Sequence, residues 1–308
     1  MKKLLTLVII FMATALSSCK SDDSDVLSDV LSIVHVSKGG TLASVLTKSG
    51  LDANQLVSLK ISGILNAEDF MTIRNMNALI NLDISEVEIT ALPEKAFYES
   101  VNIRHLILPR NLMTIGEAMF YKSGLESIVI PIGVETIETS AFQACSSLRT
   151  VTFEEGSQLK TIGGGYNGLT YLGAFSDCTS LTSIEIPASV EIIGEAAFKG
   201  CSKLANVTFE KGSQLKTIGE QAFSNCVNLM TVDMSECTQV EFINSGAFRN
   251  NSKLQLFKIG TKIPPECYGG VFEGISPYSI LKVPSGCMKY YRSADGWNSF
   301  ANIEELTE

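Results

Sequence analysis

The sequence predicts a repeat solenoid, in which one chain winds into stacked coils of short parallel β-strands between a helical N-terminal cap and an aromatic C-terminal cap. One apolar pattern recurs from Leu79 onward at intervals of 22 to 33 residues. A single copy of the pattern is too short to bury its own apolar face, whereas stacked copies share one continuous core. Length alone would suggest two domains for 308 residues, but an internal repeat overrides that prior.

Each repeat unit contains two extended segments and a closing pair. In the unit from Leu181 to Leu204, the segment Leu181–Ile186 ends in alternating apolar and polar residues, which predicts a short strand with one buried face. Val190 and Ile193 mark a second short extended piece, and Ala197-Phe198 closes the coil. The same frame begins at Leu79, Ile103, Leu125, Leu148, Leu181, Leu204, Leu229 and Leu254, and its Phe recurs at Phe97, Phe120, Phe142, Phe175, Phe198, Phe223, Phe248 and Phe272.

The two ends of the repeat array read as caps. Residues 38–78 are predicted to form the N-terminal cap with a degenerate first repeat at Leu56, including a helix over 41–49 stopped by Gly50 and a second helix capped by Asn66. Residues 79–277 hold the repeats. Residues 278–308 form the predicted C-terminal cap, sealed by the bulky side chains of Tyr290, Tyr291, Trp297, Phe300 and Ile303.

The N-terminus predicts export. A basic start is followed by a mostly apolar run, residues 4–16, which is too short to span a bilayer but suits a secretory signal. The run ends in Leu16-Ser17-Ser18-Cys19, which resembles the lipobox of bacterial lipoproteins. That resemblance implies removal of residues 1–18 and lipidation of Cys19; the alternative is an ordinary signal peptide with an incidental cysteine.

Residues 19–37 are expected to be an acidic tether. The stretch 20–25 resembles the export signal that places lipoproteins of the Bacteroides group on the outer face of the outer membrane, with the periplasmic face as the alternative. Removing residues 1–18 changes the formal charge from −9 to −11. Such a protein would repel phosphate backbones and anionic lipids, so we expect no nucleic-acid partner and membrane contact through the lipid anchor only.

The repeat units match I-P-x-x-V-x-x-I-G-x-x-A-F-x-x-C-x-x-L, which resembles the BspA-type leucine-rich-repeat family of bacterial surface proteins over roughly residues 56–308. The closing stretch from Val283 to Ile303 resembles the usual end of that family. The resemblance implies a leucine-rich-repeat-like fold and adhesion to host matrix proteins, host cells or other bacteria. It carries no ligand with it, because the family is defined by its scaffold.

Four cysteines stand three residues after the repeat Phe, at Cys145, Cys178, Cys201 and Cys226. Stacked thiols could suggest a metal or disulfides, but Asn251 occupies the same position in the next unit and zinc-ligand spacings are missing. We therefore expect a buried row of small side chains and no metal site. Cys237 is read as unpaired, and a disulfide between Cys267 and Cys287 is left open.

One unit contains an insertion. Residues 163–168 fit G-x-G-x-x-G literally, but they lie inside a repeat without the strand and helix that a dinucleotide site requires. Eight extra residues here break the period, and insertions in solenoids often form the binding face. Tyr166, Asn167 and Tyr171 are therefore the candidate ligand-binding residues, with the glycines expected to let the loop adapt. The alternative is a surface loop that lengthened freely.

The sequence leaves three candidate functions to compare. The first is a protein-binding or adhesion module, and the second a glycan-binding accessory of a surface nutrient-uptake system, which a row of exposed aromatics on the strand face would favour. That face is polar instead. The third is a hydrolase, which the residues disfavour because His35 and His105 lack the partners of a catalytic base. We expect no catalytic residue and no cofactor; ligand identity and oligomeric state stay open.

Overall fold

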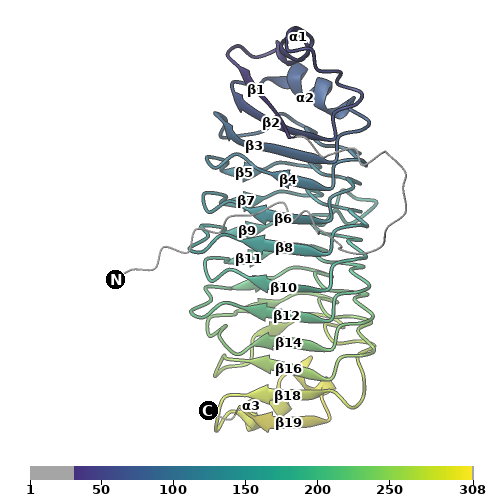
Figure 1. The fold of residues 1–308 in the computed structure, drawn as a ribbon. Helices are drawn as coiled ribbons and strands as arrows, with labels where there is room; N and C mark the ends of the chain where they lie inside the picture. The colour runs from purple at the N-terminus through teal and green to yellow at the C-terminus, as the bar shows by residue number, and fades with distance from the viewer. Residues whose placement is uncertain (1–30, 307–308) are drawn as a thin grey trace, which may run out of the picture.

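The computed structural model describes residues 31–306 and shows a parallel β-solenoid (Figure 1). The L-x-x-I-x-I segments form the first row of strands, divided into two six-stranded parallel sheets. The first sheet contains β1 (Ser32–Val36), β2 (Ser58–Gly63), β3 (Asn81–Val87), β4 (His105–Ile107), β6 (Ser127–Ile130) and β8 (Thr150–Phe153). The second contains β10 (Ser183–Ile186), β12 (Asn206–Phe209), β14 (Thr231–Met234), β16 (Leu256–Ile259), β18 (Ile280–Val283) and β19 (Asn302–Glu305).

The V-x-x-I segments form a second row, a seven-stranded parallel sheet of two-residue strands. Its members in chain order are β5 (Thr114–Ile115), β7 (Thr136–Ile137), β9 (Thr161–Ile162), β11 (Ile192–Ile193), β13 (Thr217–Ile218), β15 (Phe242–Ile243) and β17 (Glu266–Cys267). This row runs without a break past the insertion, since β9 still pairs with β11. Both predicted extended segments of the repeat are therefore confirmed.

The repeat Phe rings fill the centre of the coils, as predicted. Seven successive pairs, from Phe97 to Phe272, stack with centroids 4.9–5.7 Å apart. The 33-residue unit does not disturb them, because Phe142 and Phe175 lie 4.9 Å apart and nearly parallel. Burying one such ring stabilises the fold by about 2–3 kcal/mol, so the column is a main source of cohesion between coils.

The N-terminal end is covered by α1 (Leu42–Lys48) and α2 (Ala67–Arg74) (Figure 1). The Asn66 side chain caps α2, and Asp69 completes a capping box, which confirms the predicted cap residue. The buried Asp69 carboxylate also accepts hydrogen bonds from the backbone N–H groups of Gly40 and Leu42, so it ties α2 to the start of α1. Residues 32–36 form strand β1, which corrects their assignment to the tether: alternate residues Val34 and Val36 are buried beside β2.

The C-terminal end is closed by α3 (Met288–Ser293), the 3₁₀ turn Trp297–Ser299 and β19. Trp297 is fully buried, and its indole N–H donates to the carbonyl of Pro265 at 2.9 Å, so it is part of the plug as predicted. Tyr291, Phe300 and Ile303 are also buried. Tyr290 is the exception: it is exposed beside Lys289, because on this short helix only Tyr291 faces the core.

Candidate functional site

The insertion forms a β-hairpin rather than an irregular loop. Tyr166 and Tyr171 pair across it in an antiparallel bridge. Asn167 makes the turn, because its side-chain oxygen accepts from the N–H groups of Leu169 and Thr170 at 3.0 and 2.9 Å. Gly168, which follows Asn167 in the turn, has a φ of +90°, a conformation that favours glycine. The candidate residue Asn167 therefore has its oxygen committed to the turn.

Two glycines fix the hairpin base against the next coil. A Cβ atom on Gly164 would lie 1.8 Å from the carbonyl oxygen of Glu195, and one on Gly173 would lie 1.8 Å from that of Ala196. Only residues without a Cβ can approach a backbone so closely. We expected the glycines at 163, 164, 165 and 168 to let the loop adapt; Gly164, together with Gly173, instead holds the loop in close backbone contact with its neighbour.

Tyr171 is held on three sides. Its hydroxyl donates to Glu220, and the ammonium of Lys199 lies 4.6 Å from its ring centroid. The Tyr166 ring packs on it with centroids 4.8 Å apart. The hydrogen bond to Glu220 raises the pKa of Tyr171 to about 12, because the carboxylate disfavours a phenolate beside it. Tyr171 thus fixes the direction in which the hairpin leaves the coil.

The tip of the hairpin is exposed. Leu169 has 87 % of its surface accessible and Tyr166 has 55 %. The hairpin therefore exposes an apolar side chain together with a tyrosine, a residue type that is enriched at the hot spots of protein interfaces. Of the sequence-predicted residues, Tyr166 remains available for contact, while Tyr171 and Asn167 mainly build the hairpin.

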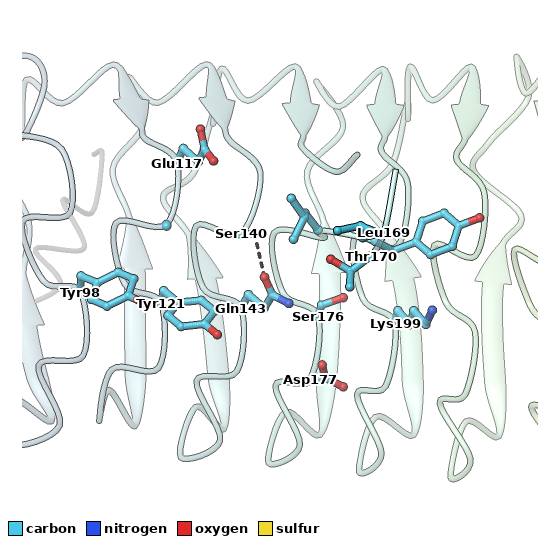
Figure 2. A pocket seen from close by; sticks show the side chains of 13 residues that line it. Tyr98, Glu117, Tyr121, Ser140, Gln143, Leu169, Thr170, Ser176, Asp177 and Lys199 are labelled. Atoms are coloured by element: carbon cyan, nitrogen blue, oxygen red, sulfur yellow. Dashed lines mark hydrogen bonds between the residues drawn. The ribbon is translucent and has the colours of Figure 1, made fainter. Parts of the chain in front are cut away.

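The hairpin overhangs a groove of about 630 Å³ on the face where the coils turn around the repeat Phe (Figure 2). The hairpin contributes Leu169 through Leu172 to its wall. Five successive coils contribute the remainder: Tyr98, Glu117, Ala118, Tyr121, Ser140, Gln143, Ser176, Asp177 and Lys199. The structure therefore brings the insertion together with residues up to 74 positions earlier in the chain, which the sequence analysis did not connect.

Tyr98 and Tyr121 are the groove residues that sequence reasoning missed. Each directly follows a repeat Phe, so they occupy equivalent positions of neighbouring coils. Their rings stack with centroids 5.1 Å apart and an interplanar angle of 19°. Lys95 lies 5.9 Å from the Tyr98 ring centroid, and Lys122 lies 5.1 Å from that of Tyr121. The recurrence of Phe-Tyr in adjacent units was the signal that could have found them.

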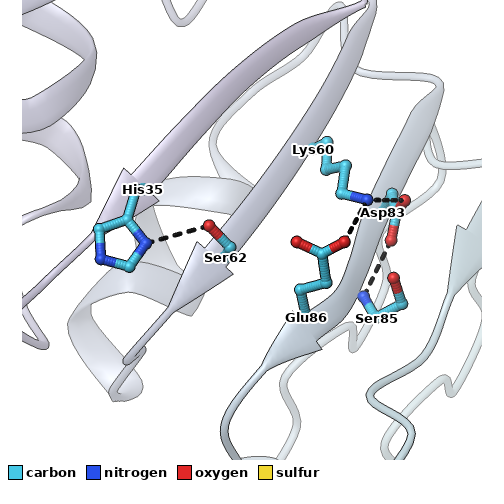
Figure 3. Close-up of polar contacts among 6 residues, drawn as sticks. All are labelled: His35, Lys60, Ser62, Asp83, Ser85 and Glu86. Atoms are coloured by element: carbon cyan, nitrogen blue, oxygen red, sulfur yellow. Dashed lines mark hydrogen bonds and ion pairs between the residues drawn. The ribbon is translucent and has the colours of Figure 1, made fainter.

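On the polar strand face, several charged side chains pair with one another. Lys60 contacts Glu86 at 2.7 Å and Asp83 at 3.5 Å (Figure 3), and the hydrogen bond to Glu86 raises the pKa of Lys60. Farther along the same face, Lys258 contacts Asp233 at 2.7 Å and Lys282 contacts Glu304 at 3.4 Å. These oppositely charged side chains therefore form ion pairs across neighbouring strands.

The two histidines lie on this strand face. His105 is exposed on β4. The ring of His35 on β1 contacts the Ser62 hydroxyl at 3.1 Å (Figure 3).

The cysteine row is structural, as expected. Cys145, Cys178, Cys201 and Cys226 are fully buried, and each thiol donates to the carbonyl of the repeat Phe in the preceding coil at 2.8–3.2 Å. The Asn251 amide makes the same bond to Phe223 at 3.0 Å. Burial raises the pKa of Cys226 to about 12. Cys237, Cys267 and Cys287 are free thiols.

Six copies of the BspA type leucine rich repeat region match residues 67–166 and 171–294. The chain belongs to the BspA-type leucine-rich-repeat family. The gap between the two matched regions, residues 167–170, coincides with the tip of the hairpin. The family's solenoid is typically a non-enzymatic scaffold, and leucine-rich-repeat proteins generally mediate protein interactions.

Solved structures of bacterial leucine-rich-repeat proteins are similar to this chain. A leucine-rich repeat protein from Bacteroides ovatus shows 18 % identity and a TM-score of 0.38, covering 82 % of this chain and 84 % of that one. A leucine-rich cell surface protein from Faecalibacterium prausnitzii shows 18 % identity and a TM-score of 0.32, covering 90 % and 83 %. The leucine-rich repeat protein of T. pallidum shows 29 % identity and a TM-score of 0.42, covering 51 % and 72 %. A search of curated proteins found no match.

The expected lipidation site, Cys19, and the signal segment lie outside the described residues. Among residues 31–306, no helix combines the length and apolar character needed to cross a membrane.

Proposed function

We propose that this protein is a cell-surface lipoprotein that binds protein ligands, as an adhesion module toward host matrix, host cells or other bacteria, and that the hairpin and its groove form the binding surface. The observation that carries the proposal is Leu169, 87 % exposed on a hairpin whose base is locked to the neighbouring coil. A rigid loop with an apolar tip loses little conformational freedom on binding, which favours affinity.

The tyrosines favour a protein over a glycan. Sugars bind aromatic residues by lying flat on a ring face. In the groove, Tyr98 and Tyr121 stack on each other, and Tyr171 lies between Lys199 and Tyr166. Each of these rings therefore has another side chain against it, which leaves less open ring face for a sugar. This supports the protein-binding function over the glycan-binding accessory.

The binding proposal is tested by capture from host matrix and mucin fractions with the mature protein. Leu169→Ser should reduce capture strongly, because it removes the apolar anchor. Ile263→Ser is the matched control, since Ile263 is 81 % exposed and distant from the groove residues in sequence. Equal capture by the two variants would remove the hairpin from consideration and leave the polar strand face.

The anchoring proposal is tested separately. Cys19→Ser should abolish labelling of the protein by a fatty-acid probe in the expressing bacterium, and continued labelling would contradict the lipobox interpretation. Intact cells treated with protease should lose the protein if it is displayed on the outer face. Full protection would indicate the periplasmic face instead.

A further inference from the structure

The groove beneath the hairpin carries two carboxylates that have no cationic partner in the part of the chain that the structure describes. Glu117 and Asp177 are exposed groove residues, and no lysine or arginine of residues 31–306 lies within ion-pairing distance of either. They project from opposite sides of the groove, with Gln143 between them (Figure 2). On the strand face, by contrast, Asp83 and Asp233 each pair with a lysine.

Among residues 31–306, Lys199 is the only basic residue that lines the groove, and its ammonium is already engaged. The Lys199 ammonium donates to Gln221 at 2.7 Å and lies over the Tyr171 ring. Gln143 is oriented by the Ser140 hydroxyl at 2.7 Å, which leaves its amide nitrogen to donate. The groove therefore offers a ligand two free negative charges and no free positive one, so complementary charge on the ligand is required.

The spacing of Glu117 and Asp177 restricts further which kind of ligand the groove can bind. Neighbouring parallel coils lie about 4.8 Å apart, so Glu117 and Asp177, which are two coils apart, are separated by about 10 Å along the solenoid axis. An extended polypeptide advances about 3.3 Å per residue and alternates its side chains between opposite sides. Residues i and i+3 of such a chain therefore lie about 10 Å apart and point to opposite sides. This rise matches the axial spacing of the two coils, and the alternation matches the placement of Glu117 and Asp177 on opposite sides of the groove (Figure 2).

We infer that the groove binds an extended polypeptide segment with basic side chains at positions i and i+3, one directed at Glu117 and the other at Asp177, beneath the apolar tip of the hairpin. The inference rests on the proposed protein-binding function and specifies the chemistry of the partner. Residues 20–25 of this chain are excluded as occupant, because their three aspartates outnumber one lysine and would be repelled by the groove.

The inference is tested by selecting a phage-displayed library of random nine-residue peptides on the mature protein, with counter-selection on a variant that lacks residues 164–171. The enriched peptides should carry Lys or Arg at two positions three apart. Enrichment of acidic peptides, enrichment without that spacing, or no enrichment over the trimmed variant would each overturn the inference.

The strongest synthetic peptide from the selection is then titrated against two double variants. Glu117→Gln with Asp177→Asn should raise Kd about tenfold, since two exposed ion pairs contribute a few-fold each. Asp177 has a φ of 59°, which asparagine also tolerates, so the fold should be kept. Glu155→Gln with Glu236→Gln changes the net charge equally at exposed residues outside the groove and should leave Kd unchanged.

An equal loss in both double variants would show a general charge effect and overturn the site. If the protein captures a matrix component in a Leu169-dependent manner but the Glu117 and Asp177 variant binds it as well as the wild type, the partner chemistry is wrong and the proposed function stands. If capture does not depend on Leu169, the proposed binding surface itself is wrong.

Discussion

The Phe column and the hairpin are joined in one coil but are stabilised in different ways. The column repeats one contact, ring on ring at 4.9–5.7 Å, and passes the longest unit unchanged. The hairpin depends on a few single contacts, two glycines at its base and the Tyr171 hydroxyl on Glu220. Stability is thus distributed along the column of stacked Phe rings. The hairpin, which is the candidate binding element, is a local feature that the stacking of the coils does not depend on.

The largest effect is expected from the column. Phe198→Ala removes a fully buried ring between Phe175 and Phe223 and should lower the free energy of unfolding by about 3–5 kcal/mol, through lost burial and a residual cavity. Urea unfolding followed by circular dichroism measures it. Leu169→Ala on the exposed tip is the control and should stay within about 0.5 kcal/mol of the wild type. A neutral Phe198 variant would contradict the register of the repeat.

A smaller effect is expected at the hairpin base. Gly164→Ala places a methyl group against the Glu195 carbonyl and forces a backbone shift, at a cost of about 2–3 kcal/mol. Gly168→Ala at the tip places its methyl group in open space. It should lower the free energy of unfolding by only about 1 kcal/mol, because alanine is strained in the left-handed backbone conformation of this residue. The same unfolding assay ranks the two variants. Equal losses would show that the base is not locked.

Removing the hairpin should cost less still. Deletion of residues 164–171 joins Gly163 to Leu172 and restores the I-G-x-x-A-F spacing of the ordinary unit. Because Ile162 and Phe175 keep their core positions, the unfolding midpoint should stay within about 4 °C of the wild type. Differential scanning calorimetry provides the measurement. A fall of tens of degrees would mean that the hairpin is part of the stabilising axis after all.

The smallest effect is expected for the ionisation of the Tyr171 hydroxyl. Its folded-state pKa of about 12 lies above the ordinary value of about 10, so the contribution of its hydrogen bond to Glu220 is complete below the ordinary value and is lost as pH rises through about 12. Glu220→Gln should return the Tyr171 midpoint toward the ordinary value. The signal is phenolate absorbance, taken as the difference between each protein and its Tyr171→Phe counterpart. An unchanged midpoint would show that Glu220 does not hold the hydroxyl.

The stacked core of the solenoid was largely predictable from the sequence, whereas the groove was not. Period and apolar positions determine which residues face inward, so the strand rows, the Phe column, the buried cysteines and the Asn66 cap all follow from pattern. The direction of the hairpin depends on how closely Gly164 approaches Glu195, a contact between coils that no local pattern records. Tyr98 lies far from the insertion in sequence and meets it only through stacking.

The boundary of the tether was misplaced for a related reason. Residues 32–36 have the alternation of a strand, but they precede the first recognisable repeat and pair with β2, which belongs to the degenerate unit. Helix α1 intervenes between the two strands, so the pairing spans a segment that the repeat frame does not cover. Likewise, Tyr290 and Tyr291 are neighbours of equal size, and only the orientation of a short helix decides which one is buried.

The hairpin leaves the solenoid between β9 and β10, close to the point where the first row of strands divides into two sheets. This position sets a path for mechanical load. With the proposed anchor at the N-terminus, a pull on the hairpin loads the coils from β1 to β9. The contacts of the hairpin with Glu195, Ala196 and Glu220 also couple it to the coils that follow β10, whereas the coils toward β19 lie beyond these contacts and outside the load path.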